Sequence, residues 1–491
     1  MPYLTGYTGA GSAGASAAYY LQQFASNFTS TSNVPPLNIT IFERSSHIGG
    51  RSTTLDIFGN TSQPVELGAS IFVSVNHNLV HAVNTFNLSI QNDDDDDGAS
   101  QVLGIWNGKE MVYTQELGGS QWQGWWNTAK LFYRYGVMAP YRTQNLMRDT
   151  VGKFLKMYDA PIFPFKSLTG AIGAVELDGV TGITGTEHLT QNGVSGLFSK
   201  ELIQASTRVN YAQDLDYIHG VEAMVCMATD GAMSVNGGNW QMFAGMVKAS
   251  GACLRLETEV REVRETLEGR YNVVAKGVSR GESLETAQYE DVFDAVIIAA
   301  PFHQTGIAFT PALEDVPSKP DFVNLHVTLF STPRQLSTSY FGLSHSSKVP
   351  DMILTTLSAE SPKNNSGLGP HSIFSISQVR TAINPETNAR EQVYKIFSSS
   401  PVSLAQLHSF VSDPSSDSEG VITWHHHHLW QSYPYLPPRT IFDDIRLGGS
   451  RKDAPGRGIW YTGGIESFIS TMETSSLSGM NVAKLIVDEL A

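Results

Sequence analysis

Three glycines near the N-terminus have the spacing of a dinucleotide-binding turn. They are Gly9, Gly11 and Gly14, in the stretch YTGAGSAGAS. In such turns the first glycine permits a tight turn, the second lets the backbone approach a pyrophosphate, and the third lets the helix pack closely on the strand. The N-terminus of the following helix offers N–H groups and a partial positive charge to the phosphates. The pattern therefore predicts a bound dinucleotide.

Glu43 is the acid expected to bind a ribose of that dinucleotide. It ends the run ITIFE at 39–43. A carboxylate at the end of the second strand accepts hydrogen bonds from ribose hydroxyls and repels a 2′-phosphate, so NADP is disfavoured. Downstream, Gly49 and Gly50 precede Arg51, which would add backbone donors and a fixed cation near the diphosphate and a flavin ring.

A strand, a helix and a second strand must position these residues. Residues 13–25 carry apolar side chains at helical spacing, which predicts a helix beginning near Ser12. ITIFE predicts the second parallel strand. The first strand reads as defective, because PYLTGY lacks the valines and isoleucines of a strand buried on both faces. We interpret the short start as a precursor trimmed or begun close to this strand, and expect upstream residues to tighten cofactor binding.

Composition excludes several classes of function. The chain has 491 residues, 41% of them hydrophobic, and a formal net charge of −15. Such acidity, with no evident basic patch, disfavours a nucleic acid partner, and no apolar run has the length of a membrane span. Cys226 and Cys253 exclude a disulfide framework, and we expect both to be buried. Five aspartates at 93–97 predict an exposed loop rather than a calcium site.

Landmarks in order along the chain resemble the prenylcysteine oxidase family, also called prenylcysteine lyases. They are GAGSAGASAAYYL, IFERSSHIGGR, LGIWNG, RVNYAQ, SVNGGNWQM, FDAVIIAAP, YKIFS, QSYPYLPP and GIESFISTMETSSLSGMNVAKL. The acid followed by GGR, and VELGASIF at 65–72, also resemble the amine oxidase and phytoene desaturase group of flavoproteins. The resemblance implies an α/β fold. We expect a Rossmann-type FAD-binding domain at 1–115, 235–305 and 440–491, and an interleaved α+β substrate domain at 116–234 and 306–439.

The resemblance also implies an activity, that of an FAD-dependent oxidase cleaving the thioether of farnesyl- or geranylgeranyl-cysteine. A hydride leaves the allylic carbon next to sulfur for the flavin, water traps the resulting cation, and molecular oxygen reoxidises the flavin. The products are cysteine, an isoprenoid aldehyde and hydrogen peroxide. Because the cofactor carries the difficult step, the protein must orient and shield that carbon. We therefore expect an apolar tunnel for a lipophilic substrate and assign no catalytic side chain.

Matching these motifs residue by residue implies a set of FAD contacts. They are Gly9, Gly11, Ser12, Ala13, Gly14, Glu43, Arg44, Gly50, Arg51, Ala69, Ser70, Val260, Gly464, Thr471 and Met472. Val260 would approach the adenine through its backbone. Gly464 and the start of the last helix, at Thr471 and Met472, would approach the flavin ring.

Two segments hold the substrate-side candidates. Trp125, Phe132 and Tyr133 belong to an aromatic stretch at helical spacing, for which core packing stays an open alternative. Arg208, Asn210 and Tyr211 lie in RVNYAQ and could equally form an interdomain hydrogen-bond network.

Four adjacent histidines at 425–428 depart from the family pattern. They cannot all face one way on a strand or a helix, so we predict a solvent-facing loop and no fixed metal site.

Five Asn-x-Ser/Thr triplets favour passage through the secretory pathway, to a lysosome, a vacuole or the outside, although no signal peptide pattern is visible. Their acceptors are Asn27, Asn38, Asn60, Asn87 and Asn364. Peripheral contact with a membrane stays open. Two other functions also stay open, because the motifs concentrate at FAD. One is a flavin oxidase of another lipophilic thioether, amine or alcohol, and the other is a non-catalytic flavin-binding or carrier protein.

Overall fold

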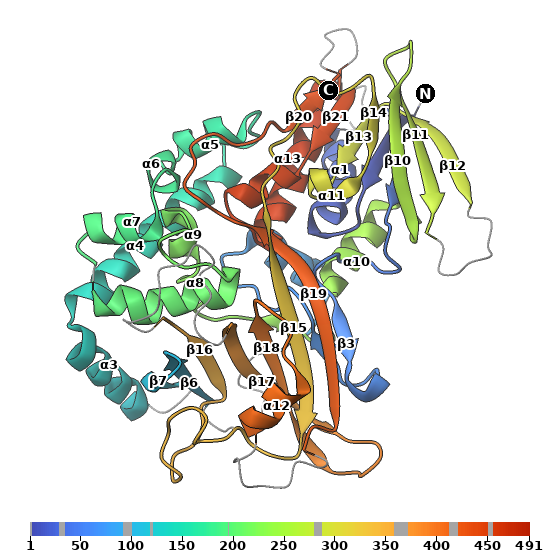
Figure 1. The fold of residues 1–491 in the computed structure, drawn as a ribbon. Helices are drawn as coiled ribbons and strands as arrows, with labels where there is room; N and C mark the ends of the chain where they lie inside the picture. Colours follow the sequence, from blue (N-terminus) through green and yellow to red (C-terminus); the bar gives the residue numbers. More distant parts are fainter. Residues whose placement is uncertain are drawn as a thin grey trace.

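A computed structural model describes most of the chain, and two sheets organise it (Figure 1). The described residues are 2–28, 35–91, 101–117, 121–194, 196–278, 287–357, 372–411, 421–449 and 455–491, with only the backbone described for 28 and 121–126. The five aspartates and Asn364 lie outside these ranges.

The first sheet has six strands in the order β20-β21-β13-β1-β2-β9, parallel except between β20 and β21. Its strands are β1 (Tyr3–Thr8), β2 (Leu37–Phe42), β9 (Cys253–Arg255), β13 (Ala295–Ile298), β20 (Arg446–Gly448) and β21 (Gly458–Tyr461). Helix α1 (Ser12–Phe28) packs against α13 (Met472–Leu490) and α10 (Trp240–Ser250) beside it (Figure 1). The expected strand, helix and second strand are thus confirmed.

Strand β1 is well buried in the middle of this sheet despite its composition. Tyr7 is fully buried, and the hydroxyl of Tyr3 donates to the backbone oxygen of Gly456 at 2.6 Å. A Cβ on Gly6 would lie 3.2 Å from the ring of Phe293, so glycine lets this ring pack tightly on the strand. The expectation of a defective first strand is therefore wrong, because neighbouring segments are shaped to receive its tyrosines and its glycine.

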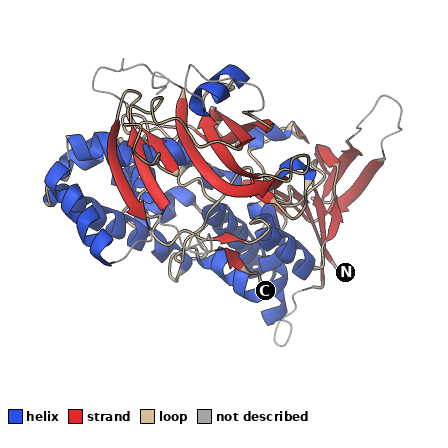
Figure 2. Ribbon diagram, turned by 90° about the horizontal axis from the view of Figure 1, so that it is seen from below, coloured by secondary structure: helices blue, strands red, loops and turns tan. Residues whose placement is uncertain are grey.

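A seven-stranded sheet forms the second body, in the order β19-β15-β18-β17-β16-β6-β7. Its strands are β6 (Gln101–Trp106), β7 (Met111–Leu117), β15 (Phe322–Thr332), β16 (Met352–Thr355), β17 (Ile373–Ile383), β18 (Arg390–Ser398) and β19 (Trp424–Pro434). In Figure 2 its long curved strands lie along one side of the helices. Those helices are α3 (Gln121–Tyr135), α4 (Met138–Leu155), α5 (Leu168–Ala174), α6 (Asp178–Thr181), α7 (Gly185–Gln191), α8 (Gln204–Tyr211) and α9 (Gly220–Val225).

Smaller elements complete the two bodies. A four-stranded sheet runs in the order β12 (Gln288–Phe293), β11 (Tyr271–Gly277), β10 (Thr258–Glu265) and β14 (Ala308–Thr310). Two short pairs are β3 (Thr54–Asp56) with β4 (Pro64–Glu66), and β5 (Ile90–Gln91) with β8 (Ser234–Val235). The remaining helices are η1 (Ile57–Gly59), α2 (His77–Thr85), η3 (Lys156–Tyr158), η4 (Ser199–Ile203), α11 (Phe302–Thr305), α12 (Leu404–Val411) and η5 (Gly463–Ser467).

Sheet membership differs from two of the expected domain boundaries. Strands β6 and β7 belong to the seven-stranded sheet, because β6 pairs in parallel with β16. The substrate side therefore begins before residue 116. Strand β14 pairs with β10, so the FAD side extends beyond residue 305.

Cys226 is buried as expected, whereas Cys253 is exposed on β9, the edge strand of the six-stranded sheet, and both are free thiols. The expectation that both are buried is thus wrong for Cys253. Among the described residues, no helix combines the length and apolar composition needed to cross a membrane.

Candidate active site

The N-terminal glycine turn is built by close backbone contacts. A Cβ on Gly14 would lie 2.0 Å from the carbonyl oxygen of Gly9, so only glycine lets α1 begin this close to β1. Gly9 has a φ of +112°, and a Cβ there would lie 2.8 Å from the oxygen of Ala299. A Cβ on Gly11, by contrast, would meet no atom closer than the Cα of Gly50, at 3.8 Å. The missing side chain of Gly11 thus leaves space where a pyrophosphate could approach.

The second glycine turn faces the first. The amide of Gly49 donates to the carbonyl oxygen of Ala10 at 3.0 Å, and Gly11 and Gly49 form an isolated β-bridge. Gly49 and Gly50 have φ values of +114° and +59°, a region that favours glycine. Two backbone turns are therefore fixed side by side at one end of a cavity.

Glu43 connects its own strand to the first turn. One carboxylate oxygen accepts from the Ala10 amide and the other from the Ser45 amide, both at 2.8 Å. The side chain is buried, yet it lines the cavity. Because a carboxylate offers about four lone-pair sites, two remain to accept ribose hydroxyls. Arg44 next to it is exposed and donates to the backbone oxygen of Gln304 at 3.2 Å.

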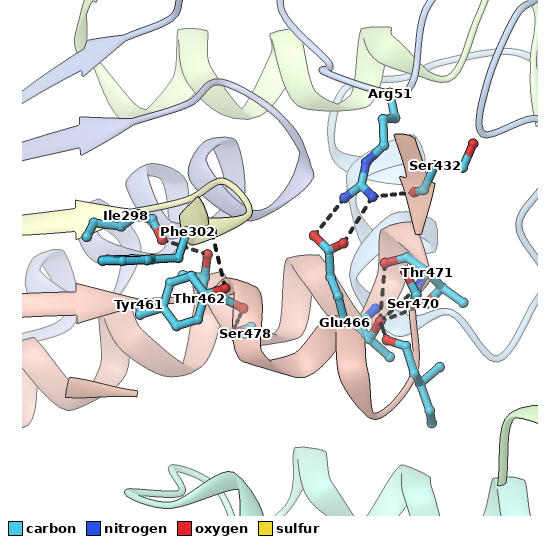
Figure 3. Close-up of polar contacts among 12 residues, drawn as sticks. Arg51, Ile298, Phe302, Ser432, Tyr461, Thr462, Glu466, Ser470, Thr471 and Ser478 are labelled. Atoms are coloured by element: carbon cyan, nitrogen blue, oxygen red, sulfur yellow. Dashed lines mark hydrogen bonds and ion pairs between the residues drawn. The ribbon is translucent and has the colours of Figure 1, made fainter. Parts of the chain in front are cut away.

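Arg51 joins three distant segments (Figure 3). Its guanidinium contacts both carboxylate oxygens of Glu466, at 2.6 and 3.0 Å, and donates to the backbone oxygen of Ser432. Glu466 belongs to η5, just before α13, and Ser432 belongs to β19. We call these three residues the Arg51 clasp.

The segment 65–70 runs beside the clasp. The amide of Ala69 donates to the carbonyl oxygen of Arg51 at 3.1 Å, and a Cβ on Gly68 would lie only 1.9 Å from that oxygen. The hydroxyl of Ser70 accepts a hydrogen bond from the Lys395 ammonium at 2.8 Å. This segment therefore lies between the glycine turns and the seven-stranded sheet.

The N-terminus of α13 also lines the cavity. Thr471 caps the helix by accepting from the amide of Thr474 at 3.1 Å, and Thr471 and Met472 line the cavity. The helix end carries a partial positive charge, which favours negative charge on a ligand there. Glu473 is buried and accepts the amides of Asn78 and Leu79, at 2.9 and 3.1 Å, which ties α13 to the start of α2.

One continuous cavity of about 1360 Å³ connects these parts. It is larger than the about 300–1,000 Å³ of ordinary ligand pockets, so it has room for a dinucleotide and a second ligand. Most of the expected FAD contacts line it, namely Gly9, Gly11, Ser12, Ala13, Glu43, Arg44, Gly50, Arg51, Ala69, Ser70, Thr471 and Met472. Together with the open space at Gly11, the spare acceptors of Glu43 and the N-termini of α1 and α13, these residues fit FAD.

Three of the expected FAD contacts, Gly14, Val260 and Gly464, are not among the residues that line the cavity. Gly14 serves the packing of α1 on β1. Val260 is buried in an apolar cluster with Phe42 and Val263. Gly464 packs against Asp443, 3.2 Å from an added Cβ. Residues that the sequence reasoning missed, Glu466, Ile469 and Ser470, line the cavity near the start of α13 instead.

Beyond Ser70 the cavity runs between helices and the seven-stranded sheet, and we call this part the apolar half after its apolar helical wall. Helices α4 and α8 and the end of α9 contribute Val151, Phe154, Leu155, Val209, Val225 and Cys226. The facing sheet contributes the apolar residues Leu325, Met352, Phe397 and Trp430 and the polar residues Ser375, Ser377, Gln378, Arg380, Thr381, Lys395, His428 and Gln431. A hydrocarbon chain could be accommodated between these two walls.

Lys395 is a buried cation in the sheet wall of the cavity. Its ammonium donates to the hydroxyl of Ser70 at 2.8 Å and to the backbone oxygen of Glu66 at 3.2 Å. Burial lowers the pKa of Lys395 and raises the pKa of Glu66, while the attraction between the two charges opposes both shifts. The sequence offered one signal for this residue, a single lysine inside the strand-like run QVYKIFS.

Glu222 is a fully buried carboxyl directly behind the cavity wall. One of its oxygens accepts from the amide of Ser470 at 3.3 Å. The Tyr211 hydroxyl lies 3.2 Å from the carbonyl oxygen of Ser470, to which it donates. Burial raises the pKa of Glu222 to about 8, so the carboxyl is mainly neutral at pH 7.

The substrate-side candidates separate into three groups. Asn210 and Tyr211 line the cavity, whereas Arg208 does not. Arg208 is 1% exposed, pairs with Asp214 at 2.9 Å and donates to the hydroxyl of Thr355 at 3.3 Å. Arg208 therefore links α8 to the seven-stranded sheet, and these contacts lie within the expected substrate domain rather than between the two domains.

The described side chains of the aromatic helix α3, residues 127–135, do not line the cavity, which corrects the expectation for Phe132 and Tyr133. Phe132 and Tyr133 are 37% and 95% exposed, because α3 packs on the body through Leu131 and Tyr135. The side chain of Trp125 lies outside the described residues.

The four histidines form part of strand β19 and not a loop, which is a second correction. Their side chains alternate between the two faces of the strand. The rings of His426 and His428 lie in a row with Trp424 and Trp430, and His427 meets His326 at 2.8 Å on the other face. In the described part of the chain, no group of three or more His, Cys, Asp and Glu residues could hold a metal ion.

The acceptor asparagines that the structure describes are all exposed. They are Asn27 near the end of α1, Asn38 in β2, and Asn60 and Asn87 in turns.

Family models and curated relatives match nearly the whole chain. The model for prenylcysteine lyase matches residues 118–491, and that for an NAD(P)-binding Rossmann-like domain matches 8–86. The chain is 29% identical to farnesylcysteine lyase of Arabidopsis thaliana, over 98% of this chain and 87% of that protein. It is 28% identical to prenylcysteine oxidase 1 of Homo sapiens, over 97% and 87%. These matches confirm the resemblance expected from the ordered motifs.

Solved structures of amine oxidases share the fold. Cyclohexylamine oxidase from Brevibacterium oxydans aligns with a TM-score of 0.55 and 13% identity over all of both chains. Putrescine oxidase bound to putrescine aligns with a TM-score of 0.57 and 14% identity over 99% of each chain. The expected α/β fold with a Rossmann-type domain of the amine oxidase group is therefore confirmed.

The buried carboxyl gives a prediction about pH. Folding raises the pKa of Glu222 from 4.5 to about 8, so its contribution to stability is full below the lower value and is lost as pH rises through the upper one. The isosteric Glu222→Gln variant stays neutral, and its stability relative to wild type should increase over this range by an amount on the order of a few kcal/mol. Unfolding midpoints measured against pH test this. Glu268→Gln, at an exposed site, is the control, and parallel profiles for wild type and Glu222→Gln would refute the assignment.

Proposed function

Because the chain belongs to the prenylcysteine lyase family, we propose that it is an FAD-dependent oxidase that cleaves the thioether of farnesyl- or geranylgeranyl-cysteine. The observation that carries the proposal is the continuity of the cavity, which joins a dinucleotide cradle to an apolar half. FAD supplies the hydride acceptor for the allylic carbon. With oxygen as final acceptor, the products are cysteine, an isoprenoid aldehyde and hydrogen peroxide.

The residues of the cradle hold and orient the cofactor. Gly11 and the Gly49–Gly50 turn let the backbone approach the diphosphate, and Glu43 offers its free acceptor sites to a ribose. The N-termini of α1 and α13 place partial positive charge at the two ends of the cradle. These groups are fixed by backbone contacts, so they need little rearrangement on binding.

The apolar half holds the isoprenoid chain and excludes water from it. Phe154 and Leu155 on α4 face the same space as Leu325 and Phe397 on the sheet. Burying such a chain supplies binding energy remote from the reacting carbon, which can be used to position that carbon. The single molecule of water that the reaction consumes must then enter from the polar side of the cavity.

Lys395 is our candidate for binding the α-carboxylate of the cysteine moiety. Its ammonium lies in the cavity wall where the segment 65–70, expected beside the flavin, meets the apolar half. The ammonium makes its hydrogen bonds to a hydroxyl and a backbone oxygen, so an incoming carboxylate would be its first hydrogen-bonded anion. Binding there would place the thioether near the flavin end.

The exposed acceptor asparagines support passage of this enzyme through the secretory pathway to a lysosome, a vacuole or the outside. A loss of mass on N-glycosidase treatment of the protein from its own cells would demonstrate such passage, and an unchanged mass would argue against it.

The activity is tested with farnesylcysteine and geranylgeranylcysteine. The purified protein, loaded with FAD, should bleach on anaerobic mixing with either compound and should release peroxide and the corresponding aldehyde in equal amounts when oxygen is admitted. A lipophilic amine or alcohol of matched chain length is the control. Turnover of the control compounds but of neither thioether would contradict the proposal.

The role of Lys395 is tested by comparing farnesylcysteine with its methyl ester. In Lys395→Met the KM for the acid should rise about tenfold or more, because a charge-assisted hydrogen bond is worth ~1.5–3 kcal/mol. The KM for the ester, which lacks the carboxylate, should change little. Equal weakening of acid and ester would show that Lys395 only supports the cavity wall.

A further inference from the structure

Helices α3 and α4 expose large apolar side chains at the corner where they meet. Tyr133, Val137, Met138 and Tyr141 are each more than half exposed, and Phe132 lies beside them. We call these five residues the corner patch. Leu197, also exposed, is close by, because Arg142 donates to the backbone oxygen of Gly193 at 2.7 Å. An exposed patch of aromatic and aliphatic side chains of this kind indicates a surface that contacts a partner.

The surroundings of the corner patch are basic in an otherwise acidic protein. Residues 121–148 contain Lys130, Arg134, Arg142 and Arg148 but no Asp or Glu, whereas the whole chain has a net charge of −15. All four side chains are exposed. Arg134 is paired with Glu201, and the nearby Asp149 with Lys153. Even with the exposed Glu116 of β7 beside α3, Lys130, Arg142 and Arg148 leave the segment 121–148 with a net positive charge, which fits an anionic partner.

Helix α4 connects the corner patch to the cavity. Its first turn carries Met138 and Tyr141, and its last turn carries Val151, Phe154 and Leu155 of the apolar cavity wall. At ~1.5 Å per residue, the helix spans about 25 Å between them. Helix α3, which carries Phe132 and Tyr133, lies at the edge of the molecule away from the six-stranded sheet (Figure 1).

We propose that the corner patch docks on the surface of an anionic lipid bilayer. Tyr, Met and Val enter the interface between headgroups and acyl chains, while Lys and Arg beside them attract the anionic headgroups. A protein of this net charge would otherwise be repelled by such a surface. If the chain has the proposed function, its prenylated substrate dissolves in the bilayer. Docking at the corner patch would then place the apolar half of the cavity one helix length from that bilayer.

Vesicle sedimentation with the full protein tests the docking. Wild type should bind phosphatidylcholine vesicles containing phosphatidylserine, and bind vesicles of phosphatidylcholine alone more weakly. The triple variant Tyr133→Ser, Val137→Ser, Met138→Ser should bind the anionic vesicles about tenfold or more weakly, because it removes the buried apolar area. Lys130→Gln with Arg148→Gln should weaken binding about fivefold for each charge.

A matched triple variant controls for the loss of apolar surface in general. Leu267→Ser, Val316→Ser, Ile441→Ser removes side chains that are also highly exposed but lie on other elements, and it should bind as wild type does. Equal binding by the two triple variants, or no binding of wild type to anionic vesicles, would overturn the proposal. Self-association that only the corner variant abolishes, without vesicle binding, would assign the patch to a second copy and overturn it as well.

The vesicle-binding experiment can succeed or fail independently of the thioether-cleavage experiment. The corner residues do not line the cavity, so the triple variant should turn over soluble farnesylcysteine at the wild-type rate. Vesicle binding needs no catalysis and is measured even if no thioether is cleaved.

Discussion

The Arg51 clasp is the contact on which the geometry of the site depends. Arg51 follows the second glycine turn, Glu466 precedes the last helix, and Ser432 belongs to the edge strand of the seven-stranded sheet. The Glu466 side chain is 9% exposed and that of Arg51 33%, so losing either partner would leave a charge in a poorly hydrated place. One ion pair thus fixes the cofactor cradle, the start of α13 and the substrate sheet relative to one another.

The polar groups around this clasp divide the cavity into regions of different charge. Backbone amides and helix N-termini gather at the cradle, where a dinucleotide brings negative charge. Lys395 supplies a buried cation at the junction with the apolar half, and Glu222 behind the wall is mainly neutral at pH 7. The protein therefore contributes position and electrostatics, which is what a reaction performed largely by a flavin requires.

Local sequence patterns were sufficient to predict the residues of the cofactor cradle. They were not sufficient to predict the residues of the expected substrate side. The roles of Gly9, Gly11 and Glu43 follow from a turn formed within one strand–helix–strand unit, so spacing alone locates them. Lys395 and Glu466 reach the cavity only through pairing between strands and segments far apart in the chain, which no local pattern encodes. The expectation for the aromatic helix failed for a related reason, because its spacing fits a buried face and an exposed face equally well. The histidine run was misjudged because alternation along an edge strand satisfies four adjacent histidines without a loop.

The clasp is tested most directly by a double-mutant cycle on the dissociation constant of FAD, using Arg51→Gln, Glu466→Gln and the double variant. If the pair holds the two halves together, each single substitution should weaken FAD binding about tenfold or more, and the double variant should be no weaker than the poorer single one, a coupling of about 1–3 kcal/mol. Independent effects that simply add, or wild-type affinity in either single variant, would contradict the claim.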